Sequence, residues 1–175
     1  MKIQVITPKT KNDYLDDILS LRVLVWEHQI GMTTFLDRRW LDEHDFHAHH
    51  WIVLNEDNSL MASARLCVHC TVSGLPDYEE IGHLLQDSHC PVAMMSRLVV
   101  NPAYQRLGIA KELDIARIEK AKQLDCNFLA AQVPIYRMRS IQALGFQCLG
   151  KAYEKTFQSL ETPDFYLYVK DLRFE

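Results

Sequence analysis

The chain has 175 residues, of which 48% are hydrophobic and 24% are charged, and its formal net charge is −4. These values are typical of a globular protein, and we expect a single domain over residues 1–175. The negative charge argues against nucleic acid as a partner, and no apolar run approaches the roughly 20 residues that span a bilayer. Because the N-terminus is too polar for a signal peptide, we expect a cytoplasmic protein that does not bind membranes.

The first half of the sequence predicts a strand, a helix and a hairpin. Residues 2–7 are expected to form a strand that Pro8 ends, and Asn12 or Asp13 suits the cap of the following helix. Apolar residues at helical spacing continue this helix to Gly31, and residues 33–41 are read as a second short helix. Residues 50–55 and 60–70 predict a hairpin around the polar turn 56–59.

The second half alternates between helices and strands. We expect a short helix over 77–86 capped by Asp77, a buried strand over 92–100 and a helix over 108–124. A strand over 127–133 follows, then a helix with Pro134 in its first turn and Gly145 at its end. Strands are expected over 146–156 and 165–172. Interleaved elements of this kind favour an α/β fold with a mixed sheet covered by helices.

The most specific segment joins the strand at 92–100 to the next helix. After Pro102 breaks the chain, it reads Gln-Arg-Leu-Gly-Ile-Ala over 105–110. Gly108 and Ala110 allow backbone N–H groups to converge on a ligand without bulky Cβ atoms in the way. Arg106 and Lys111 add positive charge beside the N-terminus of the helix. The segment therefore predicts a site for an anionic ligand that carries phosphate.

Residues 98–110 resemble the acyl-CoA-binding motif of the GNAT family of N-acetyltransferases, which reads Gln/Arg-x-x-Gly-x-Gly/Ala. The likeness extends to residues 129–132 and 143–146, and upstream to residues 21–27 and 45–50. It implies a largely antiparallel sheet of about seven strands that is splayed between its two central parallel strands, with helices on both faces. It also implies transfer of an acetyl group from acetyl-CoA to a primary amine. Dimers are common in this family, so a homodimer is compatible with the resemblance.

The resemblance assigns the cofactor contacts residue by residue. The backbone of the strand would pair with the pantetheine arm, and the turn would wrap the pyrophosphate. The backbone N–H near Leu98 or Val99 would bind the oxyanion that forms when the amine attacks the thioester. The residues concerned are Leu98, Val99, Val100, Gln105, Arg106, Leu107, Gly108, Ile109, Ala110 and Lys111.

The sequence departs from the family where the catalytic acid and base are expected. Relatives place a Tyr four residues before the Gly-Phe pair, but this chain has Ile141 there. We take Tyr136 as the first candidate for the acid that protonates the departing thiolate, and Ser140 as the second. The strand at 92–100 also lacks the Glu of many relatives. Candidates for the base are Glu43, Asp45 and His69, although a loop carboxylate is more often simply solvated.

Two arginines within predicted strands need partners. If Leu98 faces the cofactor, alternation turns Arg97 to the opposite face of the strand, where it requires a carboxylate. We expect the same of Arg65. Both are interpreted as structural, with orientation of the substrate as the alternative.

Two further functions stay open on the sequence. The segment 94–100 also resembles the corresponding strand of N-acyl amino acid and acyl-homoserine lactone synthases, so Met94, Met95, Leu84 and Leu85 could line a tunnel for a longer acyl chain or simply pack the core. The departures at the acid and base positions also allow a module that binds acyl-CoA without turnover.

Histidines and cysteines do not predict a metal site. His44, His47, His49 and His50 are dense in sequence, but Cys67-x-x-Cys70 lies in a strand pattern that points the two thiols to opposite faces. A second Cys-x-x-Cys is missing, so the usual zinc spacing is absent.

Overall fold

The computed structural model describes residues 2–6, 14–30, 39–86, 91–153 and 163–173. The expectations for Pro8, Asn12, Asp13 and Gly31 lie outside these residues, as do those for 33–38 and 154–156. The strands are β1 (Lys2–Ile6), β2 (His49–Leu54), β3 (Leu60–His69), β4 (Val92–Val100), β5 (Phe128–Pro134), β6 (Gln147–Lys151) and β7 (Phe165–Asp171). The α-helices are α1 (Leu15–Ile30), α2 (Tyr78–Ile81), α3 (Ile109–Gln123) and α4 (Met138–Gln142).

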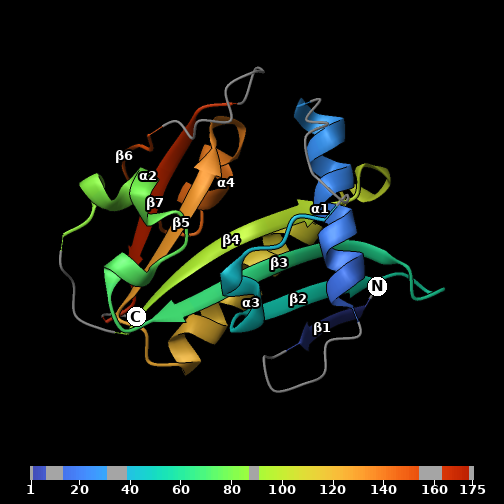
Figure 1. The fold of residues 1–175 in the computed structure, drawn as a ribbon, viewed down its shortest axis with the longest axis horizontal. Helices are drawn as coiled ribbons and strands as arrows, with labels where there is room; N and C mark the ends of the chain where they lie inside the picture. Colours follow the sequence, from blue (N-terminus) through green and yellow to red (C-terminus); the bar gives the residue numbers. More distant parts are fainter. Residues whose placement is uncertain (1, 7–13, 31–38, 87–90, 154–162, 174–175) are drawn as a thin grey trace. The chain divides into compact units, whose positions relative to one another are not determined.

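The strands form a seven-stranded mixed sheet in the order β1-β2-β3-β4-β5-β7-β6 (Figure 1). The sheet is mostly antiparallel, with β4 and β5 as the parallel pair, which confirms the predicted fold class. The register of β4 and β5 runs from Val92 opposite Phe128 to Met95 opposite Ala131. Both strands continue beyond this last pair, to Val100 and Pro134. The splay between them stays a prediction.

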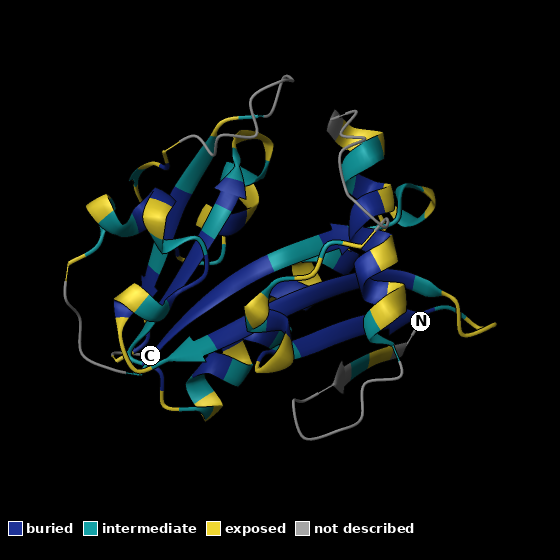
Figure 2. Cartoon of the chain, viewed as in Figure 1, coloured by how far each residue is buried: buried dark blue, intermediate teal, exposed yellow. Residues whose placement is uncertain are grey.

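The chain divides into two compact units, and the first contains Met1–Arg65 and Arg97–Asp114. In this unit α1 packs on β2, where Ile18 contacts Ile52 and Leu54. One turn further along α1, Leu21 and Val25 pack against Val99 of β4. Figure 2 shows β2 buried along nearly its whole length. The apolar face of α1 therefore packs against the end of β4 that leads into the predicted cofactor turn.

The second unit contains Leu66–Ser96 and Ile115–Glu175. Side chains from α2, β4, β5 and β7 form its apolar cluster, with partly buried Leu84 and Leu85 packed against them. Near-continuous apolar runs are expected for parallel strands buried on both faces, and Val92–Met95 and Leu129–Ala131 follow this pattern. The buried members of the cluster are Val72, Leu75, Ile81, Val92, Met94, Ala130, Ala152 and Leu167.

Most described boundaries agree with the sequence to within two residues, but three local predictions are wrong. Residues 39–41, the described part of the short helix expected over 33–41, are not helical. Asp77 precedes α2 in a left-handed conformation (φ 58°), and its side chain makes no capping hydrogen bond. Pro134 is the last residue of β5 rather than part of a helix, and a 3-10 turn over Ile135–Arg137 separates it from α4. The expected short helices at 77–86 and 134–144 are thus each divided into an α and a 3-10 segment.

Gly145 ends α4 as the sequence predicts. Its φ is +86°, and its N–H donates to the carbonyl of Gln142. A Cβ at this position would lie 2.6 Å from Nζ of Lys170. That ammonium is buried in β7 and donates to the carbonyl of Leu144, which is one of the open carbonyls at the helix end. Glycine is therefore favoured by the left-handed backbone conformation, and a larger residue would also have to displace the end of the Lys170 side chain.

Candidate functional site

The predicted cofactor turn lies between the end of β4 and the start of α3, within the first unit. The Asn101 side chain accepts a hydrogen bond from the N–H of Ala103, and a 3-10 turn covers Pro102–Tyr104. Arg106 (φ 66°) and Gly108 (φ 79°) then both adopt left-handed conformations. Alternation of left- and right-handed residues turns successive N–H groups to one side of the chain, which creates a concavity suited to an anion.

The turn fits a phosphate group in three respects. By helix geometry the first amides of α3, at Ile109 and Ala110, have no acceptor within the helix, whereas Lys111 and Glu112 donate to the carbonyl of Gly108. A Cβ added to Gly108 would meet nothing within 4 Å, so the space beside it is open. Arg106 is exposed and brings a positive charge to the turn.

Three hydrogen bonds hold the loop that carries this turn. The N–H of Asn101 donates to the carbonyl of Met61 at 2.9 Å, and Nε2 of Gln105 donates to the carbonyl of Val100 at 3.4 Å. The amide of Asn55 donates to the hydroxyl of Tyr104 at 3.3 Å. The hairpin of β2 and β3 thus anchors the loop before it reaches the turn.

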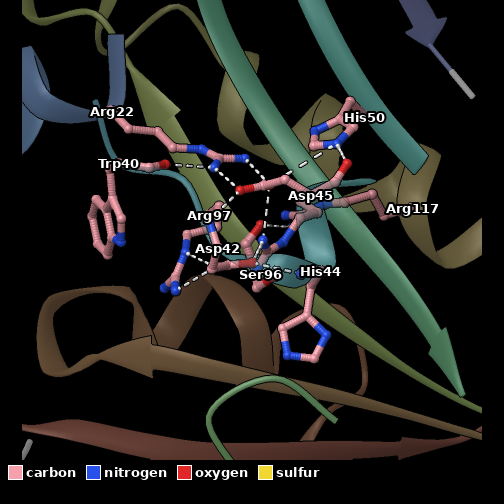
Figure 3. A network of polar contacts seen from close by, with 10 residues as sticks. Arg22, Trp40, Asp42, His44, Asp45, His50, Ser96, Arg97 and Arg117 are labelled. Atoms are coloured by element: carbon pink, nitrogen blue, oxygen red, sulfur yellow. Dashed lines mark hydrogen bonds and ion pairs between the residues drawn. The ribbon is translucent and has the colours of Figure 1, made fainter. Parts of the chain in front are cut away.

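A buried network of charged side chains occupies the interior of the same unit (Figure 3). Both oxygens of Asp45 accept from Arg22 at 2.9 Å, in the bidentate arrangement that guanidinium favours. Arg65 donates to Asp45 at 2.8 Å and to Asp42 at 2.5 Å. Asp42 and Asp45 also cap the 3-10 turn over Glu43–Phe46. This turn therefore presents two carboxylates to arginines from α1 and β3.

The network keeps Asp45 ionised. Burial by itself raises the pKa of Asp45, but hydrogen bonds and attraction from Arg22 and Arg65 hold it below its usual range. Burial opposes ionisation of Asp42 as well, and Arg65 and Arg97 hold its pKa well below the usual value. A base that works near neutral pH needs a pKa near the operating pH, so we propose that Asp45 is a structural carboxylate rather than the base.

Arg97 has the carboxylate partner that the sequence requires. Its Nη2 donates to Asp42 at 2.9 Å, and its guanidinium lies 4.4 Å from the ring centroid of Trp40. The simple alternation expected of β4 does not hold here, because Arg97 has a left-handed backbone (φ 51°) in the middle of the strand. Such a residue costs about 1–3 kcal/mol and is kept only where its surroundings fix it.

The four clustered histidines lie in different environments. His47 is exposed, whereas His50 is buried in β2 and its Nε2 donates to the carbonyl of Asp45 at 3.0 Å. Burial lowers the pKa of His50, and the positive charge of Arg22 acts in the same direction. His50 is therefore a neutral histidine that supports the turn carrying Asp45.

The candidate acids lie on the 3-10 turn after β5 and on α4, in the second unit. Tyr136 is 63% exposed, and desolvation raises the pKa of its phenol, which makes it a weaker acid than a free tyrosine. Ser140 is exposed, and its hydroxyl donates to the carbonyl of Arg137 at 2.8 Å. Ile141, at the family's tyrosine position, is fully buried. Of the base candidates, Glu43 is exposed and His69 lies half-buried at the end of β3.

The family follows from comparison with known proteins. Residues 15–146 match the model of the family described as "Acetyltransferase (GNAT) family". The chain belongs to the GNAT family. No curated protein matches it significantly. In this member the Gln-Arg-x-Gly-x-Ala sequence is present at 105–110, and Ile141, four residues before the Gly-Phe pair, is a core residue.

Solved structures share the GNAT fold at low sequence identity. An acyl-CoA N-acyltransferase from Pseudomonas aeruginosa is 15% identical, with a TM-score of 0.67 over 97% of this chain and 98% of that one. FeeM, an N-acyl amino acid synthase from uncultured soil microbes, is 13% identical, with a TM-score of 0.69 over 97% of this chain and 89% of FeeM. The CoA-dependent acyl-homoserine lactone synthase BjaI is 15% identical, with a TM-score of 0.72 over 98% of this chain and 83% of BjaI. At these identities the likeness concerns the fold alone.

Sequence reasoning missed Asp42, Trp40 and the buried Arg117 of α3. A usable signal existed, because three arginines at 22, 65 and 97 in apolar segments must find carboxylates. The spacing Asp42-x-x-Asp45 is the capping-box pattern that supplies them. Among the helices that the structure describes, none combines the length and the apolar character needed to cross a bilayer.

Proposed function

We propose that this GNAT protein transfers an acetyl group from acetyl-CoA to a primary amine. The observation that carries the proposal is the turn at 105–108, with left-handed residues at Arg106 and Gly108 and open space beside Gly108. The N–H groups that follow at the start of α3 and the charges of Arg106 and Lys111 suit a pyrophosphate. The further contacts would come from Leu98, Val99, Val100, Gln105 and Leu107.

In the proposed reaction a neutral amine attacks the thioester carbonyl directly. The C–N bond forms and an oxyanion develops, for which the backbone N–H near Leu98 or Val99 is the proposed donor. Collapse of this intermediate breaks the C–S bond and releases the thiolate of CoA. Tyr136 is the proposed acid that protonates it, with Ser140 as the alternative.

A longer acyl chain is the second candidate. Met94 lies in the apolar cluster of the second unit, with Leu84 and Leu85 packed against the same cluster. Met is unbranched and adapts to flexible apolar ligands, and this property of Met94 is what supports a longer acyl chain. BjaI, whose structure holds isopentyl-CoA, and FeeM share the fold.

A steady-state assay of CoA release distinguishes these functions. The purified protein is tested with acetyl-, octanoyl- and palmitoyl-CoA against a panel of amines, while binding of each thioester is measured by calorimetry. The proposal expects the highest kcat/KM with acetyl-CoA. Preference for the long chains would replace it with the synthase function. Tight binding without CoA release from any pair would identify a module that binds acyl-CoA without turnover.

A further inference from the structure

A buried carboxylate in the second unit is not used by the reaction described so far. Glu80 lies in α2, and only 8% of its surface is exposed. Its Oε2 accepts a hydrogen bond of 2.7 Å from Nε2 of Gln132 in β5. Carboxylates are rarely buried to this extent unless they are bonded or serve a ligand.

The main chain fixes Glu80 firmly. Its carbonyl accepts from the N–H of Tyr153 at 2.9 Å, and its N–H donates to the carbonyl of Asp77 at 3.0 Å. The next residue, Ile81, packs in the same cluster as Ala130 of β5. Since side chains two apart on a strand share a face, Gln132 lies on the face of β5 that α2 covers. The carboxylate is therefore held against one defined point of β5.

Gln132 lies next to the end of the parallel pairing between β4 and β5. Gln132 follows Ala131, which is opposite Met95 in the last pair of the β4–β5 register. An ionised carboxylate only accepts hydrogen bonds, so the Gln132 amide turns its donor atom, Nε2, toward Glu80. The acceptor atom of the same amide, Oε1, then points away from Glu80 and can accept from a ligand donor. Gln132 is partly exposed, so a ligand can reach it.

We infer that Glu80 and Gln132 form the recognition site for the acceptor amine, an inference that rests on the proposed function. The acceptor arrives as a primary ammonium, which the Glu80 charge attracts and whose N–H groups suit Oε1 of Gln132. Glu80 then takes one proton, so that the ammonium becomes the neutral amine and the carboxylate becomes the acid. After the amine has attacked the thioester, its nitrogen carries one proton more than the amide keeps. Tyr136 gives its proton to the departing thiolate and is reprotonated by this surplus proton, and Glu80 releases its proton to water.

The test compares Glu80→Gln with Glu79→Gln, a matched control at the adjacent exposed position. The probes are n-hexylamine and its uncharged analogue n-hexanol, and Kd is measured by NMR titration. We expect the wild type to bind the amine at least tenfold more tightly than the alcohol. Glu80→Gln should abolish this preference, and Gln132→Leu should weaken amine binding several-fold. Equal binding of both probes to the wild type, or an unchanged preference in Glu80→Gln, would overturn the inference.

Turnover gives a second readout that a purely structural role would not change. In Glu80→Gln the KM for the amine should rise at least tenfold, and the rise of kcat/KM with pH that reports an essential base should disappear. The Kd for acyl-CoA, measured separately, should stay at the wild-type value. If the wild type binds the amine selectively but turns over no acyl-CoA, the proposed function fails and the amine site stands. If turnover is normal and the pH profile of Glu80→Gln is unchanged, the site fails and the function stands.

Discussion

The guanidinium of Arg117, buried in α3, donates to the main-chain carbonyl of Ser96 at 3.3 Å (Figure 3). Ser96 immediately precedes Arg97, where β4 takes its left-handed conformation. A buried backbone carbonyl needs a hydrogen-bond donor, and the Arg117 guanidinium supplies one here. The arginine of the helix thus stabilises the backbone from which the proposed oxyanion donor projects.

Replacement of Arg117 tests this positioning role. Arg117→Met keeps the side-chain volume but removes the donor, so the free energy of unfolding should fall by about 1–3 kcal/mol. If the carbonyl of Ser96 also sets the backbone of β4, kcat should fall several-fold and Arg117→Lys should restore part of it. Arg139→Met, an exposed change on α4, serves as the control and should shift stability by less than about 0.5 kcal/mol. A stable Arg117→Met variant with wild-type kcat would contradict the assignment.

Gly108→Val tests the pyrophosphate turn. The left-handed φ of 79° disfavours a β-branched residue, and the new side chain would enter the open space beside Gly108. We expect the KM for acyl-CoA to rise at least tenfold, while kcat at saturation changes little. Ala103→Val, an exposed position in the same loop, should keep the wild-type KM. An unchanged KM in Gly108→Val would refute the placement of the pyrophosphate.

Substitutions at Asp45 and Glu43, which lie in the same turn, test whether Asp45 is a structural carboxylate or the catalytic base. Asp45→Asn removes the charge that two buried guanidinium groups share, and such a loss costs about 3–5 kcal/mol. Urea denaturation should therefore show a large fall in stability, whereas Glu43→Gln at the exposed neighbouring position should leave it nearly unchanged. If Asp45→Asn unfolds like the wild type but loses turnover, Asp45 is the base after all.

Stability should increase with pH across the titration of His50. Burial lowers the pKa of His50 in the folded state, while in the unfolded chain this histidine has a pKa of about 6.5. Between these two values the unfolded state binds more protons, so the free energy of unfolding rises with pH. The contribution is complete above the unfolded pKa and is lost as pH falls through the folded pKa. Denaturation curves collected across this range should lose part of their pH dependence in His50→Asn but keep it in His47→Asn.

Tyr136→Phe tests the proposed acid. Removal of the phenol should lower kcat at least several-fold without a change in the KM for acyl-CoA, since the hydroxyl would act only on the departing thiolate. Ser140→Ala examines the alternative in the same assay. Wild-type kcat in the first variant and a loss in the second would move the role to Ser140. Wild-type kcat in both would exclude the two residues.

The resemblance of residues 98–110 to the GNAT motif implied the family and its seven-stranded sheet. The sequence by itself predicted the interleaved strands and helices and the strand-turn-helix motif. These depend on periodicity and on local conformational needs, such as the glycine at 108 and the glycine that ends α4, which are encoded within a few residues. It also predicted that Arg97 and Arg65 need carboxylates, because a guanidinium in an apolar strand cannot remain unpaired.

Only the tertiary structure decided which carboxylates these are. Asp42 and Asp45 lie more than 50 residues before Arg97, and their capping-box spacing does not say which arginine each of them meets. The contacts of Glu80 with Gln132, and of Arg117 with Ser96, likewise join elements that are distant in sequence. Burial and ion pairing arise from the packing of such elements. This is why Asp45, a candidate base in the sequence, is proposed from the structure to be a structural carboxylate.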